Sequence, residues 1–184
     1  MDIKRAQSIA GINNNGGRPE NDFYPTSPES TQKLLEVETF LGSIWECASG
    51  DGSMSKVLES AGYNVISTDL EPRNYGNQLD FLSSKVLLAP NVVTNPPFKI
   101  ALEFVEHARN LGAVKIAMLC KLAFLGGAYR SQWLEASPLK MVYVFKRRPP
   151  FYRNGIKNGG TGMIEFAWFV WERGYEGNPM IGWI

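Results

Sequence analysis

Residue types that often mark a metal or disulfide protein are scarce in this chain of 184 residues. It has one histidine, His107, and two cysteines, Cys47 and Cys120. His107 falls in a predicted helix with no Cys or His partner nearby, so we expect no metal site. Both cysteines fall in predicted strands, which is typical of buried, reduced thiols in a cytosolic protein.

Long apolar runs and targeting signals are also missing. No apolar run approaches the length of a membrane span, and the N-terminus lacks a signal-peptide pattern. We therefore expect a cytoplasmic protein. The sequence has no internal repeats and no shift in composition, and its length predicts a single catalytic domain over residues 23–184. Residues 1–22 show no hydrophobic periodicity and contain a run of Asn and Gly, which predicts a flexible arm.

Net charge is close to zero, at +1, but its distribution is uneven. The window 115–157 holds nine Lys or Arg and one acid, Glu135, so it carries +8 and the remainder carries −7. Such a separation favours a polyanionic partner for the C-terminal half. The alternative is a solvated face whose charges are balanced by acids nearby in space.

The most informative stretch is Asn95-Pro96-Pro97-Phe98. It follows a short apolar strand at 91–93 and precedes a helical pattern, so it lies in the loop at the carboxyl end of a strand, where open α/β sheets bind ligands. Two prolines fix the backbone and remove two N–H donors, which leaves mainly acceptors. The turn can accept hydrogen bonds from an amino group, and the Phe ring can stack on a planar group. The alternative is a plain Pro-Pro turn with a core Phe.

Features of nucleotide-binding folds precede this tetrad. Ser27 and Pro28 are a good N-cap and first residue for a helix that ends before Gly42. A predicted strand at 43–45 leads into a glycine-rich turn at 46–52 and then a helix. The next strand ends in Asp69, which is placed to hold ribose hydroxyls. After a short third strand, Asp80 and Phe81 can accept from an adenine amino group and pack on its ring. Each acid alone is more often a turn former or a helix cap.

Three further strands are expected in the second half, at 114–119, 141–145 and 164–171, with a loop and a short helix before the second of them. The long connection at 146–162 mixes basic, aromatic and glycine residues, as nucleic-acid-contacting loops do. The candidate nucleic-acid-binding residues are Lys121, Arg130, Lys146, Arg147, Arg148, Phe151 and Arg153.

Taken together, these motifs resemble the class I S-adenosylmethionine-dependent methyltransferases, and within them the N6-adenine DNA methyltransferases of phages and prophages. The resemblance rests on the Glu-x-x-x-Gly-x-Gly turn, the two acids and the tetrad, in the order of the family. It implies a Rossmann-like α/β fold, a seven-stranded, mostly parallel sheet with an antiparallel last strand and helices on both faces. The chain departs from many such enzymes in one respect, since it lacks the length for a separate target-recognition domain, and we expect none.

The resemblance also implies roles for individual residues. S-adenosyl-L-methionine is the expected cofactor, with residues 23–26 near its methionine end and the two acids at its ribose and adenine. The residues expected to bind it are Tyr24, Pro25, Thr26, Glu46, Ala48, Gly50, Gly52, Asp69, Leu70, Asp80, Phe81 and Asn95. The catalytic residues are then Asn95, Pro96, Pro97 and Phe98, acting on an adenine flipped out of DNA.

Three alternatives stay open. Related tetrads serve enzymes that methylate adenine in structured RNA or the side-chain amide of glutamine in proteins. The charged window favours nucleic acid over protein, without separating DNA from RNA. A non-catalytic binding module of the same fold is the third alternative, and the presence of every acid together with the tetrad argues against it.

Overall fold

A computed structural model describes residues 25–148, 152–153, 156–157 and 164–184. The expected arm at 1–22, together with Tyr24 and Phe151, therefore lies outside the described residues. The helices and strands are α2 (Pro28–Leu35), β1 (Ile44–Glu46), α3 (Ser53–Ser60), β2 (Val65–Asp69), β3 (Asn77–Gln78), β4 (Asn91–Thr94), α4 (Ala101–Asn110), β5 (Lys115–Lys121), α5 (Ala128–Glu135), β6 (Leu139–Val144), β7 (Tyr152–Arg153), β8 (Ile156–Lys157), β9 (Phe166–Glu172) and β10 (Met180–Trp183). Three short 3-10 turns join them, namely η1 (Phe81–Ser83), η2 (Phe98–Ile100) and η3 (Leu122–Leu125).

Eight of these strands form one sheet in the order β10-β6-β9-β5-β4-β1-β2-β3, while β7 and β8 pair separately. The central strands are parallel, and β9 runs antiparallel to both β5 and β6. The α/β class and the mostly parallel sheet are thus confirmed. The sheet has one strand more than expected, because β10 adds to its edge in parallel with β6.

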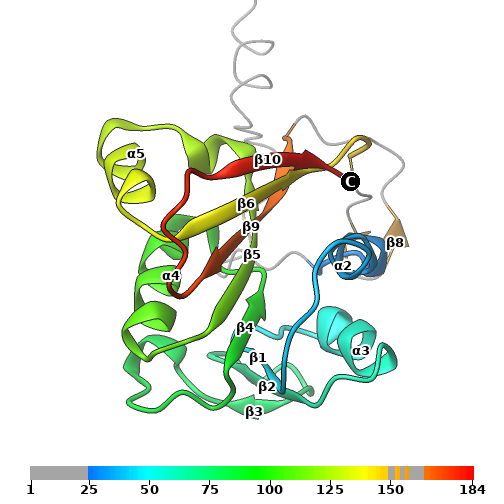
Figure 1. The fold of residues 1–184 in the computed structure, drawn as a ribbon. Helices are drawn as coiled ribbons and strands as arrows, with labels where there is room; N and C mark the ends of the chain where they lie inside the picture. The colour runs from blue at the N-terminus through cyan, green and yellow to red at the C-terminus, as the bar shows by residue number, and fades with distance from the viewer. Residues whose placement is uncertain (1–24, 149–151, 154–155, 158–163) are drawn as a thin grey trace, which may run out of the picture.

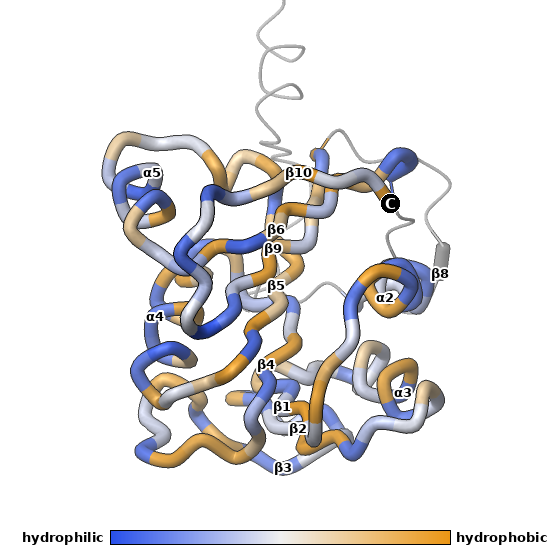
Figure 2. The backbone as a smooth tube through the Cα atoms, viewed as in Figure 1, coloured by the Kyte–Doolittle hydropathy of each residue, from blue (hydrophilic) through white to orange (hydrophobic). Residues whose placement is uncertain are grey.

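Helices cover both faces of the sheet, as expected (Figure 1). The helices α4 and α5 lie on one side, and α2 and α3 lie on the other. Successive residues of β9 point to opposite faces, so Phe169 packs in the core under α4 while Trp168 packs in the core under α2 and α3. Figure 2 shows hydrophobic residues concentrated along the central strands and hydrophilic residues along the outer side of α4. The predicted inner face of α4 is confirmed, because its buried residues are Ala101, Phe104, Val105 and Ala108.

The helix α2 is shorter than its pattern predicts. It begins as expected, with the Ser27 side chain accepting from the Ser30 N–H, but it ends at Leu35 rather than near Gly42. The carboxylate of Glu38 contacts Lys115 at 2.9 Å and the Tyr143 hydroxyl at 2.8 Å. These long-range contacts hold Glu38 against β5 and β6, and a local helical pattern cannot predict them.

A hydrogen bond ties α2 to the middle of the sheet. The indole Nε1 of Trp168, a fully buried residue of β9, donates to the Ser30 carbonyl at 2.9 Å. Because Ser30 lies in the first turn of α2, this bond fixes the start of the helix over the strand. The carboxyl end of β4 lies beside that helix start.

Trp168→Phe should therefore lower the free energy of unfolding by at least about 1 kcal/mol, the net contribution of one hydrogen bond, with a further loss from the smaller ring. Denaturant unfolding measures the change. Trp183→Phe is the matched control, because Trp183 is 63 % exposed on β10. Equal effects of the two substitutions would contradict this role for Trp168.

Candidate active site

The carboxyl ends of β1, β2, β4 and β5 open into one cavity of about 950 Å³. Its walls include Pro25 and Thr26 before α2, part of the glycine-rich turn, the end of β2 and the whole tetrad. Most of the predicted site residues line it, namely Pro25, Thr26, Glu46, Ala48, Asp69, Leu70, Asp80, Phe81, Asn95, Pro96, Pro97, Phe98, Lys121 and Arg130. The structure thus brings the tetrad and most of the residues expected to bind the cofactor into a single cavity.

The glycine-rich turn is held in place by the acid at the end of β2. Asp69 accepts from the Gly50 N–H at 2.8 Å and from the Glu71 N–H at 2.9 Å. Gly50 and Gly52 both have positive φ, at 56° and 77°, and a Cβ on Gly52 would lie 2.4 Å from the Tyr75 ring. These two glycines shape the turn, and neither of them lines the cavity wall.

Glu46 is a carboxyl group buried at the base of the cavity. Only 2 % of it is exposed, and the Ser55 hydroxyl donates to it. Burial raises the pKa of Glu46 well above its usual value, and the negative charges of Asp51 and Asp69 raise it further. A group in this position gains most from a cationic ligand, since a positive charge compensates a desolvated carboxylate.

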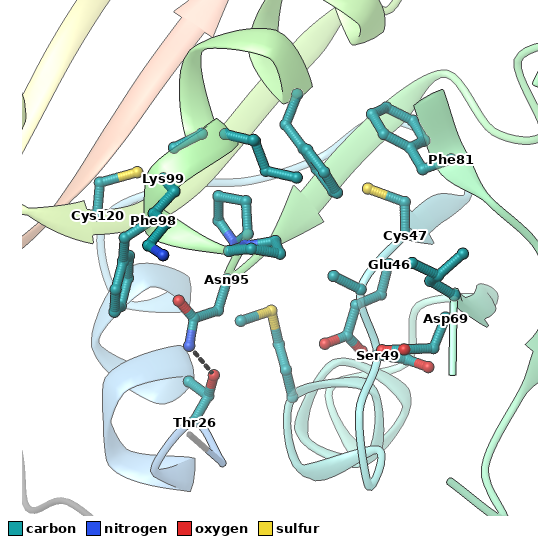
Figure 3. Close-up of a pocket in the computed structure, with 18 of the residues that line it drawn as sticks. Thr26, Glu46, Cys47, Ser49, Asp69, Phe81, Asn95, Phe98, Lys99 and Cys120 are labelled. Carbon is teal, nitrogen blue, oxygen red and sulfur yellow. Dashed lines mark hydrogen bonds between the residues drawn. The ribbon is translucent and has the colours of Figure 1, made fainter. Parts of the chain in front are cut away.

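Ser49 is a cavity residue that the sequence analysis did not single out. Its hydroxyl is buried, and among the described residues it has no hydrogen-bond partner. In Figure 3, Ser49 lies beside Glu46 and Asp69. A buried hydroxyl without a partner is uncommon, and one that lines a cavity is suited to a polar ligand. Its only sequence signal was its position inside the glycine-rich turn.

Asp80 and Phe81, expected at the adenine of the cofactor, differ in how far they are exposed to the cavity. Asp80 is exposed at the cavity wall, where its side chain accepts from the Leu82 N–H at 3.0 Å and begins η1. Phe81 is 2 % exposed, and its ring packs against Trp45 and Phe104 in the core. The ring of Phe81 therefore has little surface left for stacking on a ligand.

Asn95 lies between the two halves of the cavity (Figure 3). The acids and Ser49 are on one side of it, and Phe98 and Cys120 are on the other. Its Nδ2 donates to the Thr26 hydroxyl at 3.0 Å. The Pro97 carbonyl accepts from the Ile100 N–H at 3.0 Å and starts the 3-10 turn η2, which leads directly into α4.

Phe98 is half-buried at the far end of the tetrad. Its ring centroid lies 5.5 Å from that of Phe166, and the Nζ of Lys121 lies 4.8 Å from the Phe98 centroid. The ammonium group thus occupies part of the surface that was expected to stack on a base. A planar ligand that stacks there has to displace Lys121.

The described basic side chains of the window 115–157 do not form one uniform positive surface. Three of them are ion-paired with acids from outside the window, namely Lys115 with Glu38 and Glu172, Lys140 with Glu172, and Arg148 with Glu165. The guanidinium of Arg130 donates to the carbonyls of Phe124, Ala123 and Gly126. The ion pairs of Lys115, Lys140 and Arg148 fit the solvated-face alternative, and the bonds of Arg130 hold the η3 turn.

Two cations of the window remain exposed after β6. Lys146 and Arg147 are exposed, and within the described part of the chain neither forms an ion pair. Arg153 lies in β7, which pairs with β8 in antiparallel orientation. The remaining candidates for contact with a polyanion are thus Lys146, Arg147, Arg153 and Lys121.

Other chemistries find little support in the described residues. No cluster of three or more potential metal ligands occurs among them. None of the described helices is long and apolar enough to cross a membrane. Burial raises the pKa of both Cys47 and Cys120, so these thiols stay protonated and supply no thiolate nucleophile.

Comparisons with known proteins identify the fold. No protein-family profile matches the chain, and no curated protein sequence matches it. Among solved structures, it is similar to a type I restriction-modification methyltransferase subunit from Streptococcus thermophilus, with 13 % identity and a TM-score of 0.58 over 84 % of this chain and 45 % of that one. It is also similar to the 23S rRNA methyltransferase ErmE, with 12 % identity and a TM-score of 0.57 over 83 % and 70 % of the two chains.

A third similar structure is a predicted O-methyltransferase from Agrobacterium tumefaciens, with 10 % identity, a TM-score of 0.56 and 86 % of each chain covered. This chain has the fold of these methyltransferases. It spans about half the length of the Streptococcus subunit. The three proteins are named for different activities, so the shared fold does not select a substrate.

Glu46 provides a test of the site that needs no ligand. Because folding raises the pKa of this carboxyl, the folded state keeps the proton to higher pH than the unfolded chain does. The stability contributed by the protonated form is complete below the ordinary carboxyl pKa, and it is lost as the pH rises through the raised value.

Glu46→Gln should remove this loss and raise the free energy of unfolding at pH 7 by about 1–3 kcal/mol, the cost of a buried polar group without full compensation. Denaturant unfolding at pH 5, pH 7 and pH 8 measures the change in this free energy. Glu103→Gln, at an exposed position on α4, is the control. A Glu46→Gln protein less stable than the parent at pH 8 would show that the carboxylate is already compensated.

Proposed function

We propose that this protein transfers a methyl group from S-adenosyl-L-methionine to the exocyclic N6 of adenine in DNA. The proposal rests on one observation above the others. The Asn-Pro-Pro-Phe turn leaves the carboxyl end of β4 inside the same cavity as Glu46, Ser49 and Asp69. A methyl donor and an acceptor nitrogen can therefore be held side by side in one cavity.

The acidic half of the cavity fits the cofactor. A ligand with an ammonium group compensates the desolvated Glu46 carboxylate, and a ligand with hydroxyl groups gives the buried Ser49 hydroxyl a partner. Asp69 keeps acceptor capacity beyond its two backbone bonds, since a carboxylate has about four lone-pair sites. When bound, S-adenosyl-L-methionine supplies an electrophilic methyl group on a sulfonium.

The tetrad is suited to activate an amino group. The lone pair of the adenine N6 is delocalised into the ring, so the nitrogen is a poor nucleophile. Asn95 and the Pro96 carbonyl supply acceptors for its two hydrogens and favour a more tetrahedral nitrogen. The Asn95 amide already uses Nδ2 toward Thr26, so its carbonyl oxygen is the group that serves the substrate.

Phe98 and Lys121 favour a nucleotide in the half of the cavity beside the tetrad. A flipped base stacks on the Phe98 ring only after the Lys121 ammonium moves off it. The displaced ammonium then lies beside the base, where the phosphate of a nucleotide provides a charge partner. A glutamine side chain of a protein substrate provides no such anion.

The direct test is methyl transfer from labelled S-adenosyl-L-methionine to DNA, RNA and a protein extract, with identification of the modified product. We expect N6-methyladenine in DNA. N6-methyladenine in RNA alone, or label in glutamine, would replace the DNA assignment by the corresponding alternative. No transfer to any of the three substrates would contradict the proposed function.

Asn95→Ala should lower the methyl-transfer rate by at least roughly a hundredfold, the effect of losing a preorganised polar contact to the reacting group. Its affinity for S-adenosyl-L-methionine, measured by calorimetry, should change little. Asn77→Ala on the exposed strand β3 is the control. Near-normal turnover by Asn95→Ala would exclude the mechanism.

The exposed cations after β6 predict a salt dependence. Each phosphate contact contributes a slope of about −0.9 to log K against log salt on duplex DNA. The double variant Lys146→Ala/Arg147→Ala should flatten the slope by about 1–2 and weaken all sequences alike. Lys140→Ala is the matched control, because Lys140 is paired with Glu172 at 2.8 Å. Equal slopes for the double variant and the parent would remove this segment from the DNA interface.

A further inference from the structure

Thr26 contacts the tetrad directly, through Asn95. The sequence resemblance places it at the methionine end of the cofactor. In the structure its hydroxyl oxygen accepts from Asn95 Nδ2 at 3.0 Å, and both residues line the cavity. Figure 3 shows the Asn95 side chain extending from the end of β4 to Thr26.

We infer that Thr26 is a positioning residue that sets the orientation of the Asn95 amide. The inference rests on the proposed function, because it assigns how the acceptor for the substrate amino group is prepared. The two ends of an asparagine amide are nearly equal in shape but opposite in hydrogen bonding, since the NH2 end donates and the oxygen end accepts. With Nδ2 bound to Thr26, the carbonyl oxygen lies on the other side of the amide, toward Phe98 in Figure 3.

The orientation matters because the reverse one is unproductive. An amide turned by half a rotation presents its NH2 group to the amino group of the substrate, and two donors then face each other. A Thr hydroxyl can donate as well as accept, so it is the observed bond, with Nδ2 as the donor, that leaves the Asn95 oxygen in the orientation that accepts a hydrogen bond from substrate.

The backbone around Thr26 is fixed well enough for this role. Pro25 precedes it and Pro28 follows two residues later, so φ is restricted at both positions. Between them, the buried Ser27 caps α2 and bonds the Ser30 hydroxyl at 2.8 Å. The bond from Trp168 to the Ser30 carbonyl then ties this turn to β9. The turn that carries Thr26 is thus tied to β9, while Asn95 follows directly after β4.

The test compares Thr26→Val, which keeps the shape and removes the hydroxyl, with Thr26→Ser, which keeps the hydroxyl. At saturating cofactor and substrate, the single-turnover rate of Thr26→Val should fall roughly threefold to tenfold, the population shift expected for one hydrogen bond. Thr26→Ser should keep most of the rate. In an Asn95→Ala background, Thr26→Val should lower the rate no further, because Thr26 acts through Asn95.

A second readout does not depend on activity. The side-chain NH2 signal of Asn95 in an amide NMR spectrum is assigned by its loss in Asn95→Ala. Thr26→Val should shift this signal, and Thr26→Ser should leave it close to its original position. An unmoved signal in Thr26→Val would overturn the inference, even if the parent enzyme methylates adenine.

The outcome for a cofactor residue is different. In that case Thr26→Val weakens binding of S-adenosyl-L-methionine in calorimetry, leaves the single-turnover rate at saturation unchanged and leaves the Asn95 signal in place. That result would return Thr26 to the role implied by the sequence resemblance. A parent protein that transfers no methyl group, with the NMR shift still observed in Thr26→Val, would contradict the proposed function and leave the Thr26–Asn95 contact standing.

Discussion

Parallel pairing of β1 with both β2 and β4 is the constraint on which the site depends. Ile44 of β1 is aligned with Val65 of β2 and with Asn91 of β4, so the three strands end at the same edge of the sheet. The indole of Trp45 donates to the Thr68 hydroxyl at 2.8 Å and helps to hold β1 against β2. A shift of one residue would turn the side chains of β1 to opposite faces. Glu46, Asp69 and Asn95 meet only in the observed register.

This arrangement has a cost in stability that a ligand can offset. The glycine-rich turn places Glu46 where burial raises its pKa, and it leaves the Ser49 hydroxyl without a partner among the described residues. Neither feature contributes to folding, whereas both are reduced when a polar, cationic ligand enters. Sites that are locally unfavourable in the free protein are where function is expected, since no packing argument explains them.

The sequence was a good guide wherever a local pattern decided the structure. The inner face of α4, the Ser27 cap and the strand before the tetrad were all predicted, because periodicity and capping residues act over a few positions. The early end of α2 and the strand β10 were not predicted. The first depends on contacts of Glu38 with Lys115 and Tyr143, and the second is a four-residue strand whose side chains are mostly exposed.

The roles of the charged residues were the hardest part to predict. Net charge in a window cannot reveal that Arg148 faces Glu165 or that Arg130 binds the carbonyls of its own turn. The bond between Thr26 and Asn95 is equally invisible, since 69 residues separate the two in the chain. Such partners are set by the topology of the sheet, and the sequence pattern of one element does not contain them.

The cavity that results is asymmetric in charge, and this asymmetry limits what it can bind. Glu46, Asp51 and Asp69 lie at its β1 and β2 side, together with one cation, Arg73, whereas Lys99 and Lys121 lie beside the tetrad. A single small anion or cation would suit one end and be repelled by the other. Two ligands of opposite character, a cationic one among the acids and an anionic one beside the lysines, satisfy both ends at once. Asn95 lies between the two ends of the cavity, which is the position that the proposed function requires of it.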